Sequence, residues 1–127
     1  MSLRIAVIGA GPAGGLIAGL LAREGHRVTL GDRRDRAAME ANEDRSIQLS
    51  VSPRGMGALA AAGLDETMKT RSIPLAGRVF HRPDSSLLSL LPTDPSWKNF
   101  STDRGELTGT ILDWAAAASG LELRLGW

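Results

Sequence analysis

R-I-A-V-I-G-A-G-P-A-G-G-L-I-A-G-L-L-A-R-E-G-H-R-V-T-L-G-D is the sequence of residues 4–32. It begins with an apolar run that predicts a strand, and continues with a glycine-rich turn, a helix with an apolar stripe and a second strand that ends on an acid. A strand, glycine turn, helix and strand in this order form the βαβ unit that holds an adenine dinucleotide. Residues 4–32 therefore predict an α/β protein with a Rossmann-like dinucleotide-binding fold.

The glycine turn is the predicted diphosphate site. Gly9 permits the tight turn after the first strand, Gly11 lets the backbone approach a pyrophosphate, and Gly14 lets the helix pack closely on the strand. The helix then begins with unpaired N–H groups and the positive end of its dipole directed at the diphosphate. All six residues of the turn are candidate cofactor-binding positions: Gly9, Ala10, Gly11, Pro12, Ala13 and Gly14.

An acid and three arginines follow the second strand. Asp32 lies 23 positions after Gly9, where an acid accepts hydrogen bonds from the adenosine ribose hydroxyls. Its charge disfavours a 2′-phosphate, whereas Arg33, Arg34 and Arg36 favour one. Arg33 and Arg34 lie nearest the adenine edge and are candidate cofactor-binding residues. The alternative, to which Arg36 is better suited, is a solvated strand exit, so these residues alone leave the identity of the dinucleotide open.

The strands and the helix of this unit carry further expectations. Residues 5–8 are apolar without interruption, which is typical of a central parallel strand buried on both faces. The helix is expected to end near Glu24, with Gly25 as its C-cap. Gly15 and Gly19, in the helix interior, each cost about 1 kcal/mol relative to alanine. They therefore indicate close packing, with the sheet as the candidate partner.

The chain between the second and the last strand is too long for a simple crossover, which indicates an inserted segment. Its pattern first predicts a polar connection over 37–44, in which residues 37–41 could alternatively form one helical turn. It then predicts, in order, an alternating strand over 45–51, a helix over 53–62 opened by Ser52, a short helix over 64–69 and two strands within 75–91. After it, residues 104–119 predict a helix. Residues 121–125 alternate as an edge strand does, and we expect them to form the third parallel strand, beside the second.

Composition limits the classes of function. The chain has 127 residues, a formal net charge of +1, and three Trp and two Phe as its only aromatic residues, so neither charge nor stacking indicates nucleic acid. The lack of cysteine excludes disulfides and suits a reducing cytoplasm. No apolar run approaches the ~20 residues of a membrane span. His26 and His81 have no partners at metal-binding spacing. We therefore expect a soluble cytoplasmic protein with no nucleic-acid, membrane or metal partner.

Four more pieces of sequence follow the glycine turn: R-S-I-Q-L-S-V-S-P-R-G (45–55), A-L-A-A-A-G-L (58–64), S-I-P-L-A-G-R-V-F-H (72–81) and S-T-D-R-G-E-L (101–107). In this order the chain resembles the amino-terminal part of the kynurenine 3-monooxygenases and, more broadly, the FAD-dependent aromatic hydroxylases. The resemblance implies an FAD-binding domain over 1–127, with 71–101 contributing short strands of a partial substrate-side sheet. Family members continue further, to a later Gly-Asp-Ala motif, so the fold is expected to be incomplete relative to the family.

The resemblance also implies cofactor contacts. The three glycines of the turn would line the FAD diphosphate, and Asp32 would hold the ribose. Arg34 would lie beside the adenosine and Ser50 near the flavin. Arg104, in the D-R-x-x-L pattern before a helix, would reach back to the cofactor phosphate or ribityl chain.

For the substrate, the resemblance implies one residue. Arg78, in R-V-F-H, matches the arginine that in this family grips the carboxylate of an amino-acid substrate, a task that suits a planar guanidinium. The kynurenine enzymes place a tyrosine near the following loop, and this chain has no tyrosine. That difference argues against kynurenine itself as the substrate.

The activity that the resemblance implies is that of a flavin-dependent monooxygenase, an oxidoreductase. FAD, reduced by NADPH, would react with O2 and hydroxylate a small aromatic substrate; no catalytic residue is assigned in this chain. We expect it to be inactive without the missing remainder: the chain would be either a fragment of a longer enzyme or one chain of a split enzyme, whose second chain supplies the other part. The alternatives are a non-catalytic dinucleotide-binding module and a purely structural remnant.

Overall fold

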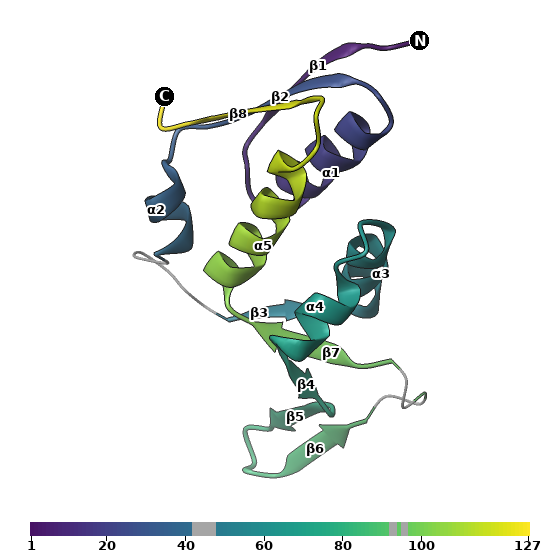
Figure 1. The fold of residues 1–127 in the computed structure, drawn as a ribbon. Coiled ribbons are helices and arrows are strands. Elements are labelled where there is room, and N and C mark those ends of the chain that lie inside the picture. The colour runs from purple at the N-terminus through teal and green to yellow at the C-terminus, as the bar shows by residue number, and fades with distance from the viewer. Residues whose placement is uncertain (42–47, 92–93, 95–96) are drawn as a thin grey trace. The chain divides into compact units, whose positions relative to one another are not determined.

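The computed structural model describes residues 1–41, 48–91, 94 and 97–127 (Figure 1). Two compact units are distinguished, Met1–Ile47 with Asp103–Trp127, and Gln48–Thr102, and each is described by itself. Part of the expected polar connection (42–44), the first residues of the expected strand (45–47) and positions 92, 93, 95 and 96 lie outside the described residues.

The first unit contains a three-stranded parallel sheet. Its strands are β1 (Arg4–Ile8), β2 (Arg27–Asp32) and β8 (Leu121–Leu125), in the order β1-β2-β8. The register aligns Val7 with Leu30 and Leu30 with Leu123. The expected third parallel strand beside the second is therefore confirmed, and so, among the strands that the structure describes, is its position at an edge.

The expectation that the first strand is central was wrong. β2 is the middle strand, and four of its six residues are buried. Within the described residues β1 pairs only with β2, and its residues alternate between exposed and half-buried. An apolar run predicts a strand, but its burial depends on which other strands lie beside it.

Two long helices of this unit lie side by side, α1 (Pro12–Arg23) and α5 (Arg104–Ala116) (Figure 1). Gly25 follows α1 with a φ of +91°, as expected for the residue after a helix end. Gly15 and Gly19 pack against α5 and not against the sheet: a Cβ on Gly15 would lie 2.9 Å from Ile111 Cγ2. The expected sheet contact was therefore wrong, because these glycines face the other helix.

A short helix, α2 (Arg36–Glu40), completes the first unit; Asp35 caps it by accepting a hydrogen bond from Ala38 N at 2.7 Å. The core of the unit is formed by small and aliphatic side chains from the sheet, the three helices, the glycine turn and the loop after α5: Ala10, Ala18, Ala22, Val28, Leu30, Met39, Leu112 and Ala118.

The second unit combines short antiparallel strands with two helices. β3 (Leu49–Val51), β7 (Asn99–Thr102) and β4 (Ile73–Leu75) form one sheet in the order β3-β7-β4, and β5 (Arg78–His81) pairs with β6 (Leu87–Leu90). The helices are α3 (Pro53–Ala61) and α4 (Asp65–Thr70). Ser52 caps α3 by accepting a hydrogen bond from Gly55 N at 3.3 Å, as the sequence predicts. None of the described helices is long and apolar enough to cross a bilayer.

Candidate functional site

Each glycine of the turn has a different structural reason to be glycine. Gly9 has a φ of +102°, which disfavours side chains, and its N–H donates to Gly31 O at 2.7 Å. A Cβ on Gly14 would overlap the carbonyl oxygen of Gly9, so only glycine lets the helix start this close to the turn. A Cβ on Gly11 would meet no atom within 4 Å. The space beside Gly11 is therefore open, as a closely approaching diphosphate requires.

The first turn of α1 contains no group that would satisfy its unpaired N–H groups. Gly11 is the N-cap, with no side-chain hydrogen bond to the cap, and the first turn holds no acidic residue. The first N–H groups of a helix have no intrahelical partner and carry partial positive charge. This helix end therefore suits an external anion such as a diphosphate.

Asp32, at the end of β2, is the buried acid of the site, with only 8% of the residue exposed. Its Oδ2 accepts from Ala10 N at 2.9 Å and from Arg34 Nη2 at 3.1 Å. Its Oδ1 accepts from the backbone N and the Nε of Arg34, at 2.9 and 3.1 Å. One carboxylate therefore joins the glycine turn to the exit of β2.

These contacts set the charge of Asp32. The hydrogen bond from the Arg34 side chain and, to a smaller extent, those from the backbone N–H groups of Arg34 and Ala10 together lower the pKa of Asp32 to about 2, against the opposing effect of burial. The same pair raises the pKa of Arg34. The acid is thus ionised at any physiological pH, as an acceptor for hydroxyl groups must be.

Gly126 and Trp127 contact the residues around Asp32, at the end of β2. The sequence analysis did not predict these contacts. Gly126 N donates to the carbonyl oxygens of Asp32 and Arg34, at 3.0 and 3.1 Å. The Trp127 indole packs against the backbone of Gly31, where a Cβ would lie 2.8 Å from its Cζ2. Its Nε1 donates to Arg124 O at 2.9 Å. The pairing of β8 with β2 was the only signal that could have placed these residues here.

The three arginines after β2 have different contacts in the structure. Arg34 is bound to Asp32, as described, and Arg33 is exposed and makes no ion pair with any described residue. Arg36 binds Glu40, Gly109 O at 3.2 Å and Asp113 Oδ1 at 2.9 Å. Arg36 is therefore neither a solvated residue at a strand exit nor directed at the glycine turn. Its contacts connect α2 to α5.

Arg104 is the first residue of α5, after Asp103, which caps the helix by accepting from Glu106 N at 3.0 Å. Arg104 is exposed, and among the described residues no contact joins its guanidinium to the glycine turn or Asp32. The structure therefore does not bring Arg104 together with the rest of the expected cofactor site.

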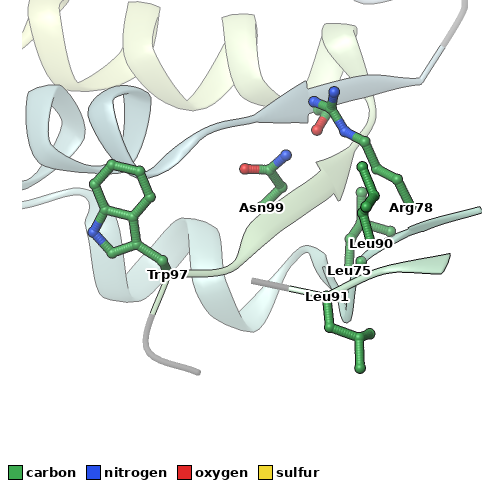
Figure 2. A pocket seen from close by; sticks show the side chains of 8 residues that line it. Leu75, Arg78, Leu90, Leu91, Trp97 and Asn99 are labelled. Atoms are coloured by element: carbon green, nitrogen blue, oxygen red, sulfur yellow. The ribbon is translucent and has the colours of Figure 1, made fainter. Parts of the chain in front are cut away.

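The second unit has a surface pocket of about 490 Å³ that brings together two expected residues, Ser50 and Arg78. Figure 2 shows the Arg78 side chain at one end of the view, Trp97 at the other and Asn99 between them. The sequence analysis missed Trp97 and Asn99 as lining residues, because their strand and loop gave no chemical motif. The complete lining is Ser50, Leu75, Gly77, Arg78, Leu90, Leu91, Trp97 and Asn99.

Among the described residues, no three or more His, Cys, Asp or Glu side chains are grouped so that they could hold a metal ion. The groups that are present suit an organic ligand: an open backbone approach, a helix N-terminus for phosphates and an ionised acid for hydroxyls. These features fit the adenosine diphosphate part of a dinucleotide.

A family model described as "FAD binding domain" matches residues 2–125. Among curated proteins, the kynurenine 3-monooxygenase of Salinispora tropica is 45% identical over 86 residues, which are 66% of this chain and 19% of that protein. The kynurenine 3-monooxygenase of Stenotrophomonas maltophilia is 37% identical over 119 residues, which are 92% of this chain and 26% of that protein. The chain therefore spans about a fifth to a quarter of the length of these relatives.

Solved structures show the same fold. The myxobacterial chondrochloren halogenase, an FAD-dependent halogenase, aligns with a TM-score of 0.78 at 24% identity, over 99% of this chain and 29% of that one. The p-nitrophenol 4-monooxygenase of Pseudomonas putida aligns with a TM-score of 0.74 at 17% identity, over 99% of this chain and 32% of that one. The expected α/β fold and its incompleteness relative to such proteins are thus confirmed.

Proposed function

The chain belongs to the family of FAD-binding domains, with FAD as its cofactor, and we propose that it holds the adenosine diphosphate half of FAD for a monooxygenase. The observation that carries the proposal is the corner formed by the glycine turn and Asp32. There an open backbone at Gly11, an uncapped helix start and a buried carboxylate lie within one unit. They match a diphosphate and a ribose in the order in which FAD presents them.

Each residue of the corner has a defined task in this proposal. The N–H groups at the start of α1 bind the diphosphate, Gly9 and Gly14 hold the turn in place, and Asp32 accepts from the ribose. Bound FAD would supply the redox chemistry: NADPH would reduce the flavin, and the reduced flavin would activate O2, so that one oxygen atom enters an aromatic ring and the other leaves as water. This chain's contribution is to bind and orient the cofactor.

Arg78 and its pocket are the proposed substrate element. The pocket places one cation among the side chains of Leu75, Leu90 and Trp97. An apolar wall with one guanidinium suits a small aromatic molecule that carries a carboxylate, because the planar fork pairs with both oxygens. A kynurenine-like amino acid has this chemistry. Ser50, in the same lining, is the proposed flavin-side contact.

The proposed activity needs more residues than 1–127. The chain spans only 19% to 26% of the length of the relatives described above, so the enclosure of the flavin ring and the activity itself require further residues. A second chain is one source of them. The proposed location is the cytoplasm, because a chain without cysteine suits a reducing compartment.

The test is a titration of the purified chain with FAD, followed by flavin fluorescence, and with ADP, followed by calorimetry. Wild type should bind both, whereas Gly11→Val should lose binding at least about a hundredfold, because its side chain fills the space for the diphosphate. Gly57→Val is the matched control, since a Cβ on Gly57 also meets no atom within 4 Å but lies on α3.

The outcomes separate the alternatives. Normal FAD binding by folded Gly11→Val would refute the diphosphate site. Tight binding of ADP with no binding of FAD would favour a non-catalytic nucleotide-binding module. A folded wild type that binds neither ligand would leave only a structural role.

A further inference from the structure

The Asp32 carboxylate has no free acceptor site in this structure. An ionised carboxylate offers about four lone-pair sites. Four donors take them: Ala10 N and Arg34 Nη2 on Oδ2, and Arg34 N and Nε on Oδ1, all between 2.9 and 3.1 Å. A ribose hydroxyl that binds Asp32 must therefore replace one of these donors.

The four donors differ in how easily they leave. Two are backbone N–H groups, and the one on Ala10 belongs to the glycine turn itself, so releasing them would distort the site. The other two belong to the guanidinium of Arg34, whose side chain is 48% exposed. Rotation of the Arg34 side chain moves the guanidinium into solvent and leaves the backbone unchanged. Only the guanidinium is thus a replaceable ligand of Asp32.

We propose that the Arg34 guanidinium occupies the ribose position on Asp32 and that the adenosine hydroxyls bind by displacing it. The proposal rests on the proposed function of the corner as the site of the FAD adenosine. In this arrangement Arg34 keeps the buried carboxylate ionised and oriented before the cofactor arrives. It also competes with the cofactor, because two charge-assisted hydrogen bonds must break before two hydroxyls can bind.

The inference predicts that Arg34 weakens the contribution of the ribose hydroxyls to binding. The measurement is a cycle of dissociation constants for ADP and for 2′,3′-dideoxy-ADP, which lacks both hydroxyls, with wild type and Arg34→Ala. In wild type the ribose hydroxyls should add little to the affinity, because their hydrogen bonds to Asp32 replace those that Arg34 already makes. In Arg34→Ala they find empty lone pairs, so the preference for ADP over the dideoxy compound should rise by about tenfold.

Arg27→Ala is the matched control. It removes the same charge from the other end of β2, where Arg27 is exposed and forms no ion pair with a described residue. Its preference for ADP over 2′,3′-dideoxy-ADP should equal that of wild type. A rise in this variant equal to that in Arg34→Ala would assign the effect to net charge and overturn the proposal.

A second measurement needs no variant. The Nε–Hε resonance of Arg34 in wild type should move on addition of ADP, since that hydrogen bond to Asp32 Oδ1 breaks, and should stay in place with the dideoxy compound. This measurement also decides the question if Arg34→Ala does not fold.

Two results would overturn the inference alone: an unchanged or smaller preference for ADP in folded Arg34→Ala, or an Arg34 resonance that ADP leaves in place. Either would mean that Arg34 only orients Asp32. A wild-type chain that binds neither ADP nor FAD would instead refute the proposed function, and the inference with it. The two failures are therefore distinguishable.

Discussion

Gly19 of α1 and Trp114 of α5 lie so close together that a methyl group on Gly19 would overlap the indole carbon Cζ3. Arg23, on the same helix as Gly19, lies over that indole, with its guanidinium carbon 4.7 Å from the ring centroid. Its Nη2 donates to Trp114 O at 3.3 Å. The two helices are thus joined by an indole that fits only because position 19 has no side chain.

Gly19→Ala should therefore destabilise the protein, although alanine favours a helix by about 1 kcal/mol. We expect a net loss of about 1–3 kcal/mol in the free energy of unfolding, because the indole must shift from its packed position. Denaturant unfolding measures it. Gly57→Ala in α3, where an added Cβ meets no atom within 4 Å, should instead be neutral or stabilising. A stabilised Gly19→Ala would contradict the packing described here.

The Asp32 carboxylate should make stability depend on pH at the acid end. Its pKa is about 2 in the folded protein, below the ordinary 3.8. The ionised form is therefore favoured by folding, and this contribution is complete above about pH 4 and is lost as the pH falls toward 2. It amounts to at most about 2 kcal/mol, and less at high salt because Arg34 is half exposed.

The measurement compares the unfolding free energies of wild type and Asp32→Asn from pH 7 down to pH 2. The difference between them should be constant above about pH 4 and shrink below it. A difference that stays constant through this window would mean that Asp32 is not held ionised by Arg34.

Arg36→Ala should lower stability without changing cofactor affinity. Arg36 binds Glu40, Gly109 O and Asp113, but Asp113 is largely exposed, so the loss should be about 1 kcal/mol. FAD affinity should be unchanged within about twofold, because Arg36 faces α5. Flavin titration and denaturant unfolding of the same variant test both statements. If the variant bound FAD more weakly but kept its stability, Arg36 would instead have a role in cofactor binding.

Arg78→Ala should weaken binding of an aromatic amino acid in the pocket of the second unit. We expect about a tenfold loss for L-kynurenine, measured by ligand-detected NMR, since a bidentate pair with the carboxylate is removed. The carboxamide of the same compound should bind wild type and variant equally. Arg82→Ala, in the hairpin turn beyond β5, is the control. Equal loss for acid and amide would exclude a carboxylate grip.

The sequence predicted the local features of the fold well. The turn at Gly9, the helix end at Gly25 and the Ser52 cap depend on residues close in sequence, so a short pattern contains all the information that they need. The position of β1 and the partner of Gly19 depend on residues about a hundred positions away. No periodicity within a strand or helix reveals such neighbours, and both expectations failed.

The candidate site shows the same division. The glycine turn and Asp32 were expected together, and the hydrogen bond from Ala10 N joins them. The pairing of Arg34 with Asp32 was not predicted, although the two residues are only two positions apart. Arg34 was instead expected to contact the adenosine part of the cofactor. Arg36 was misassigned because its partner Asp113 lies 77 positions away.

Trp127 gives this corner a natural optical reporter. Its indole lies against Gly31, next to Asp32 in the chain, whereas Trp114 is packed between α1 and α5. Events at the Asp32 carboxylate should therefore perturb the emission of Trp127 and leave that of Trp114 unchanged. With Trp97 and Trp114 each replaced by Phe, the remaining fluorophore would let the departure of the Arg34 guanidinium be followed in real time by stopped-flow mixing, without any label.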